Sequence, residues 1–192
     1  MTTRLGSLNT TQIPTIWRDH CRNARISLAS CGFQFQALQS TPELFDDVAR
    51  FHERIYRDQH AWDPVEDLTH EQCLDLFMDD NELDPAMQFL AFQDGNLCAV
   101  ASLRTTADAD QLDLGWIGAV NVPPEHSRPL HQALFGLCID AVDHRGSSMR
   151  IEIDRVDPNA NAVVDGLPVH WDEELVTVGT TITATEDNAV SG

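Results

Sequence analysis

The amino-acid sequence predicts an α/β fold of the α+β kind, in which a mixed sheet carries helices on both faces. Three observations support this prediction. Two β-type segments meet at a hairpin turn, a third follows them directly, and a helix then connects the third segment to a fourth. Strands joined by tight turns pair antiparallel, whereas strands joined through a helix pair in parallel. We therefore expect an antiparallel meander followed by a strand–helix–strand (βαβ) unit.

Residues 1–40 show no clear apolar period and carry four Arg against a single Asp. We interpret them as an N-terminal arm that is flexible apart from a short helix near Ile16 to Ile26. An Arg-rich, acid-poor start is also typical of a transit peptide. No apolar run is long enough for a membrane span and no signal-peptide core is recognisable, so we expect no membrane association.

Two helices are predicted between residues 41 and 78. Thr41-Pro42-Glu43 combines an N-cap residue, a first-turn Pro and an acidic side chain near the positive end of the helix. Apolar residues then recur at helical spacing to about residue 58. Thr69 and Gln72 form a capping-box pattern before a short second helix that ends near residue 78. We expect a loop over 60–68 and an acidic turn over 79–85.

Three strands should follow in a row. Residues 87–93 and 97–105 flank Asp94-Gly95, which is a strong hairpin signal. A polar loop over 106–110 leads into a third strand over 111–122. That strand should stop at Pro123-Pro124, because proline cannot donate to a sheet ladder.

A long helix is predicted to begin near the two prolines and to end at Gly146, a C-cap residue. Residues 148–154 alternate apolar and charged side chains, which predicts a half-buried strand parallel to 111–122. Residues 160–171 allow at most one helical turn, and 174–183 predict a last strand. The predicted domain therefore spans 41–184, followed by a disordered tail over 185–192. The apolar face of the long helix comprises Leu130, Ala133, Leu134, Leu137, Cys138, Ala141 and Val142.

The 192 residues carry a formal net charge of −19, and all 12 basic residues are Arg. This charge argues against direct binding of nucleic acid, whose phosphates need basic contacts. It favours a cationic substrate or partner, although a genome-wide or salt-adapted bias in surface composition explains it as well. The five Cys are odd in number and form no CxxC, so we expect reduced thiols and a cytoplasmic protein.

Beyond these patterns, the sequence resembles the Gcn5-related N-acetyltransferase (GNAT) superfamily. The order of elements over roughly residues 33–160 carries part of the resemblance, and the segment 122–134 (VPPEHSRPLHQAL) carries the rest. In that superfamily a strand ends in V-x-P-E-[HY]-R, and the next helix opens with R-x-x-G-x-G/A-x-x-L. If one loop residue is absent, the segment fits this frame at Val122, Pro124, Glu125, His126, Arg128, Leu130, Ala133 and Leu134.

The resemblance implies an acyl-CoA-dependent N-acyltransferase that uses acetyl-CoA as co-substrate and acts on a small-molecule or peptidic amine. Backbone N–H groups at the start of the helix would hold the pyrophosphate. The end of the preceding strand would donate to the thioester carbonyl. The residues implied in binding acetyl-CoA are Val120, Asn121, Val122, Ser127, Arg128, Leu130, His131 and Gln132.

The sequence departs from the superfamily pattern in the phosphate loop. Pro129 and His131 fill both glycine positions; the proline has no N–H, and neither side chain lets a phosphate approach as closely as glycine does. The helix after residue 154, which often carries a catalytic Tyr, is missing or shortened. These departures favour an alternative hypothesis, a catalytically inactive GNAT-fold module for interaction or regulation.

Asp113, Glu125 and Tyr56 are the predicted catalytic residues. Some relatives place a carboxylate base on the central strand, where Asp113 lies, although a solvated outward residue fits the pattern too. Glu125 can move protons near the strand end, and it is also simply favourable at a helix N-terminus. Tyr56, the only Tyr in the chain, is either a catalyst or a rim residue of its helix.

We predict no metal site, because His70 and Cys73 lack a second pair of ligands. A less favoured hypothesis is an acidic protein that mimics nucleic acid for a basic partner. A homodimer is compatible with the sequence, which does not fix the oligomeric state.

Overall fold

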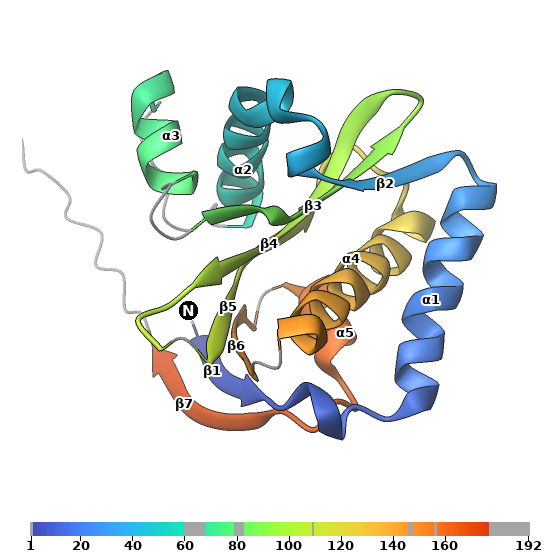
Figure 1. Ribbon diagram of the computed structural model, residues 1–192, viewed down its shortest axis with the longest axis vertical. Helices are drawn as coiled ribbons and strands as arrows, with labels where there is room; N and C mark the ends of the chain where they lie inside the picture. The colour runs from blue at the N-terminus through green and yellow to red at the C-terminus, as the bar shows by residue number, and fades with distance from the viewer. Residues whose placement is uncertain are drawn as a thin grey trace, which may run out of the picture.

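A mixed sheet of seven strands forms the centre of the computed structural model, which describes residues 2–59, 68–78, 83–108, 110–145, 148–155 and 157–176. The strand order is β2-β3-β4-β5-β6-β1-β7 (Figure 1). All neighbours pair antiparallel except β5 and β6, which pair in parallel. The strands are β1 (Thr2–Leu8), β2 (Phe33–Ala37), β3 (Leu83–Gln93), β4 (Asn96–Thr105), β5 (Gln111–Ala119), β6 (Ser148–Asp154) and β7 (His170–Val176).

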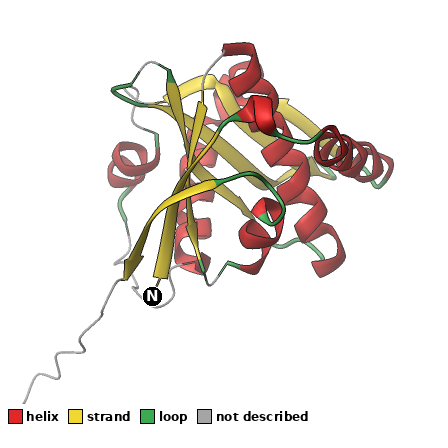
Figure 2. Ribbon diagram, turned by 90° about the horizontal axis from the view of Figure 1, so that it is seen from below, coloured by secondary structure: helices red, strands yellow, loops and turns green. Residues whose placement is uncertain are grey.

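Helices cover both faces of the sheet (Figure 2). One face carries α1 (Thr15–Ser30), α4 (Pro124–Arg145) and α5 (Pro158–Val164), and the other carries α2 (Phe45–Gln59) and α3 (His70–Phe77). Short 3-10 turns occupy Thr10–Gln12, Leu38–Ser40 and Pro42–Leu44. Within the described ranges, no helix is both long and apolar enough to cross a membrane.

The predicted antiparallel meander and the parallel strand pair are confirmed. Asp94 and Gly95 join β3 to β4 with positive φ angles of 51° and 78°, as the hairpin signal predicts. The capping box before α3 is present, since Gln72 N–H donates to the Thr69 hydroxyl and Thr69 N–H donates to the Gln72 side chain. Local sequence signals therefore position the β3–β5 meander and the helices around it.

The sheet separates two hydrophobic cores. The larger core lies between the sheet and the α1–α4–α5 face, and its most buried side chains include Leu130, Leu134 and Ile151. The second core joins α2 and α3 to β3, β4 and β5, with Phe51 and Phe77 at its centre. In the described part of the chain, β6, β1 and β7 contribute no residue to the second core. The described residues of α2 and α3 therefore cover the β3–β5 part of that face more than the β6–β1–β7 part.

The N-terminal segment differs from the arm that the sequence suggests. β1 lies inside the sheet, where residues 3–8 pair with β6 on one side and residues 2–7 pair with β7 on the other. α1 runs from residue 15 to residue 30, longer than the short helix expected, and β2 forms the opposite edge of the sheet. Residues 2–40 are thus part of the same packed unit as the described residues of 41–176.

Backbone contact fixes the position of β1. A Cβ atom on Gly6 would lie 2.7 Å from the His170 carbonyl oxygen and 2.8 Å from Cε3 of Trp171. Beside it, the Arg4 guanidinium stacks over the Trp171 ring at 4.1 Å and donates to Asn161 Oδ1 at 2.8 Å. Glycine at position 6 therefore allows the bulged β1–β7 pairing, and Arg4 ties β1 to α5 and β7.

The chain after β6 also differs in part from expectation. α5 is a seven-residue helix rather than a single turn. Its cap is Asp157, whose side chain accepts from Asn159 N–H and Ala160 N–H. β7 begins at residue 170, four residues earlier than predicted. The predicted C-cap Gly146, the core of the 60–68 loop, most of the 79–85 turn and everything beyond residue 176 lie outside the described residues.

α1 packs along α4 on the larger core. Trp17 meets Phe135 edge to face at 5.6 Å, and a Cβ on Gly136 would lie 2.7 Å from the Cys21 Cβ. At one end of this contact Arg18 pairs with Asp143 at 2.5 Å. All five cysteines are free thiols, and only Cys31 is exposed. Burial, together with the nearby Asp140 carboxylate, raises the pKa of Cys21 to about 12 and so suppresses its thiolate.

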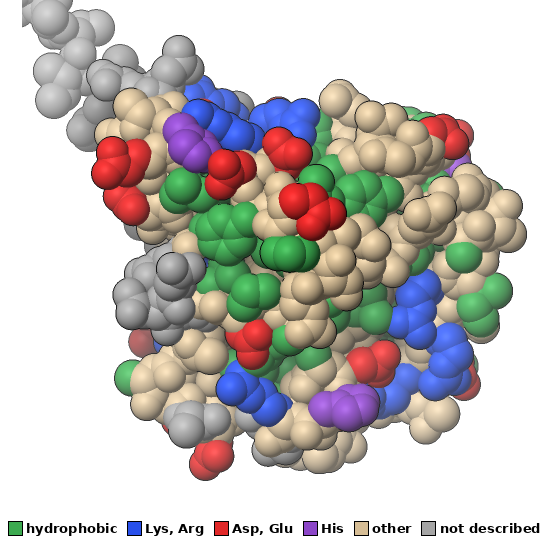
Figure 3. Space-filling view, turned by 45° about the horizontal axis from the view of Figure 1, so that its top comes forward, with side chains coloured by type: hydrophobic (Ala, Val, Ile, Leu, Met, Phe, Trp, Pro, Cys, Tyr) green, Lys and Arg blue, Asp and Glu red, His purple; other side chains and the backbone are tan. Residues whose placement is uncertain are grey.

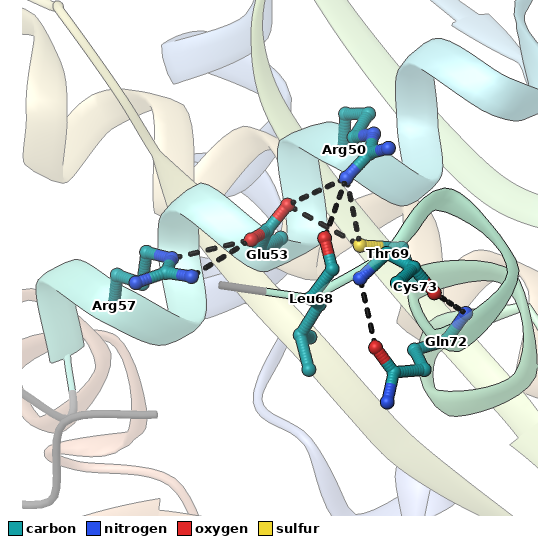
Figure 4. A network of polar contacts seen from close by, with 7 residues as sticks. All are labelled: Arg50, Glu53, Arg57, Leu68, Thr69, Gln72 and Cys73. Atoms are coloured by element: carbon teal, nitrogen blue, oxygen red, sulfur yellow. Dashed lines mark hydrogen bonds and ion pairs between the residues drawn. The ribbon is translucent and has the colours of Figure 1, made fainter. Parts of the chain in front are cut away.

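A polar network holds α3 against α2 (Figure 4). The Glu53 carboxylate, 13% exposed, accepts from Arg50 at 3.3 Å, from Arg57 at 3.0 Å and from the Cys73 thiol at 3.2 Å. Burial alone would raise the pKa of Glu53, but these hydrogen bonds outweigh burial and lower it. The buried carboxylate is therefore compensated, and it fixes the helix pair that borders the hollow described below.

Replacing Gly6 with Ala should destabilise the protein, because the added Cβ collides with backbone and ring atoms on β7. We expect the free energy of unfolding to fall by about 1–3 kcal/mol, measured by urea denaturation. Ser7→Ala, one residue along the strand, is the matched control and should change it by less. Equal effects at the two positions would contradict the close packing of β1 against β7.

Candidate functional site

β5 and β6 separate partway along their length. They pair over only four positions, from Gln111 with Ser148 to Leu114 with Ile151. Beyond this point, in the described part of the chain, β5 pairs only with β4 and β6 pairs only with β1. The facing backbone groups of the two strands are therefore not paired with each other there. We call this opening the split.

A β-bulge marks the start of the split. Leu103 pairs with Leu114 and Ser102 pairs with Trp116, which leaves Gly115 as the extra residue on β5. Trp116 N–H donates to the Ser102 hydroxyl at 2.8 Å instead of to a strand carbonyl. Because of the bulge, Asp113 and Trp116 both face the α2–α3 side although they are three residues apart.

A hollow of about 650 Å³ lies at the split on the α2–α3 side. Both separating strands contribute to it, β5 through residues 111–116 and β6 through Arg150 and Glu152. Seen with the α2–α3 end turned forward, apolar side chains gather across the middle of the surface and charged side chains of both signs surround them (Figure 3). The remaining lining residues are Arg104, Thr105, Thr106, Ala107 and Asp108.

Three charged residues cross the floor of this hollow at paired strand positions. Arg104 on β4 is opposite Asp113 on β5, which is opposite Arg150 on β6. Arg150 forms an ion pair with Asp113 Oδ2. The other oxygen, Asp113 Oδ1, is buried and has no hydrogen-bond partner among the described residues. Arg104 is held by the Leu76 and Phe77 carbonyl oxygens at the end of α3.

The end of β5 directs the backbone N–H of Ala119 toward the split. Val120 N–H donates to the Cys98 carbonyl at 2.9 Å, on the β4 side. Successive N–H groups of a strand point to opposite sides, so the N–H of Ala119 points toward the split. Asn121 is exposed in a left-handed conformation with φ of 59°, and Val122 packs against the larger core. The backbone N–H that faces the split at this end of β5 is thus that of Ala119 rather than that of Val120.

The first turn of α4 follows directly and offers few donors to a phosphate. Pro124 has no N–H, and His126 N–H donates to the Pro123 carbonyl at 2.9 Å. The N–H of Glu125 remains, beside its own carboxylate, because the Ser127 N–H is the first that the helical ladder of α4 uses. Pro129 lies inside the helix, so the Glu125 carbonyl lacks its usual helical partner.

The other residues implied in cofactor binding divide between surface and core. Arg128 is exposed and Gln132 is half-buried, whereas Leu130 is fully buried and His131 is 3% exposed. The His131 ring contacts the Ser127 carbonyl through Nδ1 at 2.8 Å, and burial lowers its pKa despite that contact and the nearby Asp157. Leu130 and His131 therefore belong to the core beneath α4. Of the residues implied on this helix, Ser127, Arg128 and Gln132 are the ones that can contact a ligand.

The three predicted catalytic residues lie in two places. Asp113 lies in the hollow, and the Tyr56 ring is 5.7 Å from the ring of Trp116, which lines it. Glu125 is exposed in the first turn of α4, beyond the far end of β5. Ala119 lies six residue steps along β5 from Asp113, a span of about 20 Å. Asp113 and Glu125 thus cannot act on the same atom in this conformation.

His52 lies behind Trp116 and was not singled out from the sequence. Its ring is fully buried, 6.0 Å from Phe77 and 6.3 Å from Trp116, and neither ring nitrogen has a hydrogen-bond partner among the described residues. Burial, with a smaller contribution from the Arg104 charge, lowers its pKa to about 3. α2 can lie this close to β5 because residue 118 is glycine. A Cβ atom there would lie only 2.6 Å from the Ile55 side chain.

Sequence reasoning also missed Arg150 and the bulge at Gly115. Arg150 reads as the polar position of an alternating strand, and only the parallel register places it beside Asp113. A glycine inside a β-type segment was the available signal for the bulge. No group of three or more His, Cys, Asp or Glu side chains suited to a metal ion occurs in the described ranges.

Comparison with known proteins shows the fold. No family model matches the chain, and no curated protein matches it in sequence. Among solved structures, a GCN5-related N-acetyltransferase from Sphaerobacter thermophilus aligns with 90% of this chain and 49% of its own, at 16% identity and a TM-score of 0.55. A GCN5-related N-acetyltransferase-like protein from Streptococcus suis aligns with 91% and 59%, at 15% identity and a TM-score of 0.54.

A third structure is similar to the same degree. The C-terminal domain of a putative lysylphosphatidylglycerol synthetase from Agrobacterium fabrum covers 91% of this chain at 12% identity and a TM-score of 0.57, with 60% of its own length aligned. The chain therefore spans between 49% and 60% of these three structures. At these identities the likeness establishes a GNAT fold.

Replacing His52 with Leu should make the free energy of unfolding depend less on pH in the acid range. The folded-state pKa of about 3 lies below the ordinary value of 6.5, so between these values the unfolded chain binds a proton that the folded chain does not. The stabilisation that comes from keeping His52 neutral is therefore fully present above pH 6.5. It falls by about 1.4 kcal/mol per pH unit as the pH drops toward 3.

Urea denaturation between pH 8 and pH 4 measures this slope. The His52→Leu protein should lose less stability over that range than the parent. Identical slopes would show that His52 is not the group responsible.

Proposed function

We propose that this protein is an acyl-CoA-dependent N-acyltransferase that transfers an acetyl group from acetyl-CoA to an amine. The observation that carries the proposal is the split between β5 and β6, which begins at a bulge and opens onto a hollow containing Asp113. Beyond Leu114 the two strands no longer pair, which leaves room for an extended acyl donor, and the hollow at the start of the split provides the Asp113 carboxylate. Room for the thioester and a proton acceptor for the amine are what direct attack of an amine on a thioester requires.

The chemistry divides between the co-substrate and the chain. Acetyl-CoA supplies an activated acyl group when bound. The N–H of Ala119 points toward the split, where it can donate to a carbonyl of bound acetyl-CoA. The Asp113 side chain, 23% exposed, can accept a proton from an amine in the hollow. Trp116 forms an apolar wall of the same hollow and limits access of water.

The residues present fit the two ends of acetyl-CoA unequally. The thioester end is well matched by the split. At the phosphate end, Glu125 supplies the first-turn N–H that the helix leaves open, and Arg128 is the nearest exposed cation on the helix. Each donor that is missing relative to an open glycine loop costs about 1–3 kcal/mol of binding, so the proposal predicts weak binding rather than none.

The altered start of α4 supports a second candidate, a GNAT-fold module without catalysis. Pro129 is part of the helix and His131 is buried in the core, so neither position resembles an open glycine loop. In this alternative the split and hollow would bind a partner or regulator without acyl transfer.

Calorimetric titration with acetyl-CoA, followed by a thiol-release assay over a panel of amines, distinguishes the two candidates. We expect a dissociation constant near about 0.1–1 mM and release of coenzyme A that depends on the amine. Heat of binding without thiol release on any amine would favour the non-catalytic module. No heat at millimolar acetyl-CoA would contradict both the cofactor site and the proposed reaction.

Arg128→Ala should weaken acetyl-CoA binding by about five- to tenfold, because a surface guanidinium contributes a screened, charge-assisted contact to a phosphate. The effect should shrink as salt concentration rises. Arg145→Ala, at the opposite end of the same helix, is the matched control and should leave the dissociation constant unchanged. Equal weakening in both variants would indicate general electrostatics rather than a phosphate contact at Arg128.

A further inference from the structure

The hollow on the α2–α3 side combines both signs of charge at short range. Asp113 on β5 and Glu152 on β6 supply carboxylates. Arg150 supplies a guanidinium from the β6 position that is opposite Asp113 and two residues before Glu152. This mixture contrasts with the chain as a whole, whose formal net charge is −19. Although the protein is strongly acidic, Arg150 lies beside Asp113, the carboxylate to which we assign proton transfer.

The ion pair in the hollow leaves binding capacity on both partners. Arg150 uses one nitrogen, Nη2, to contact Asp113 Oδ2, and its side chain is 52% exposed. The Asp113 side chain is 23% exposed; its Oδ1 atom is buried without a partner among the described residues, so a ligand would reach Asp113 through Oδ2. Glu152, exposed on the same face, forms no ion pair among the described residues. A guanidinium donates several N–H groups and a carboxylate accepts several, so both still have partners to gain.

We infer that this hollow is an acceptor site for a small zwitterion, a molecule with an ammonium and a carboxylate a few atoms apart, as in a free α-amino acid. The ligand's carboxylate binds the exposed N–H groups of Arg150, and its ammonium pairs with the carboxylates of Asp113 and Glu152. This inference rests on the proposed function, because it names the substrate class for the same site.

Other classes of amine match the hollow less well. A polyamine would place a second cation against Arg150, and a dicarboxylate without an amine would meet Asp113 and Glu152 with like charge. A ligand that carries both charges satisfies each group with its opposite. It also places its nitrogen beside Asp113, which is two residues from the bulge at Gly115 where the split begins.

The reaction balances without any further reactant. The amine nitrogen forms a bond to the acyl carbon while the bond from that carbon to sulfur breaks. The ammonium group loses two protons overall. One ends on the sulfur of coenzyme A, and the other passes through Asp113 to solvent.

Calorimetry without acetyl-CoA tests recognition separately from catalysis. The standard α-amino acids are titrated into the full chain, and the best binder is compared with its α-carboxamide and with its deaminated acid. We expect each analogue to bind at least about tenfold more weakly, the typical loss of one charged hydrogen bond. Arg150→Gln should remove the preference for acid over amide, and Asp113→Asn should remove the preference for amine over deaminated acid.

Arg155→Gln is the matched control, since Arg155 is similarly exposed but pairs with Glu174 on β7. It should keep both preferences. Arg150→Lys retains the charge and should keep part of the preference for the acid, which separates recognition from misfolding. Unfolding midpoints check that each variant remains folded.

The outcomes separate the inference from the proposed function. Binding with the expected preferences but no thiol release would uphold the zwitterion site and reject acyl transfer. No binding of any amino acid at about 10 mM, or equal binding of acid and amide, would overturn the zwitterion site. Turnover of simple amines with unchanged rate in Arg150→Gln would overturn it as well, while supporting acyl transfer.

Discussion

The rest of the structure depends on the pairing of β1 with β6. β6 leaves β5 after Ile151, and a strand that lost one neighbour without another would expose its backbone on both sides. β1 pairs with β6 from Met149 to Asp154 and so holds it along its whole length. The split can stay open because the N-terminal strand satisfies the far edge of β6. The N-terminus of the chain therefore supports a site formed by residues more than a hundred positions later.

Much of the fold could be predicted because its signals are local. The Asp94-Gly95 turn, the Thr69–Gln72 capping box and the strand–helix–strand unit each depend on neighbouring residues, and the structure has all three. The place of β1 could not be predicted in this way. Its partners lie about 145 to 175 residues away, and its glycine matters only once β7 is beside it. α5 was underestimated although Asp157-Pro158 carries an N-cap and first-turn signal.

The site could be predicted only in outline. Asp113 was singled out by its place on a central strand, but its partner Arg150 depends on the parallel register and its neighbour Trp116 depends on a one-residue bulge. Both are properties of pairing between strands, which a single segment does not encode. For His131 the motif position predicts a phosphate loop, but the side chain points from α4 into the core and is buried. Motif spacing identifies positions along a helix, and packing decides which side chains reach a ligand.

The central claim is that the split between β5 and β6 receives the acyl donor. Amide chemical shifts during titration with acetyl-CoA test it most directly, because they report on individual N–H groups along β5 and α4. We expect the largest shifts at Gly115 to Ala119 and in the first turn of α4, with little change at β2 and β3. Shifts confined to other strands, or none at saturating acetyl-CoA, would contradict the claim.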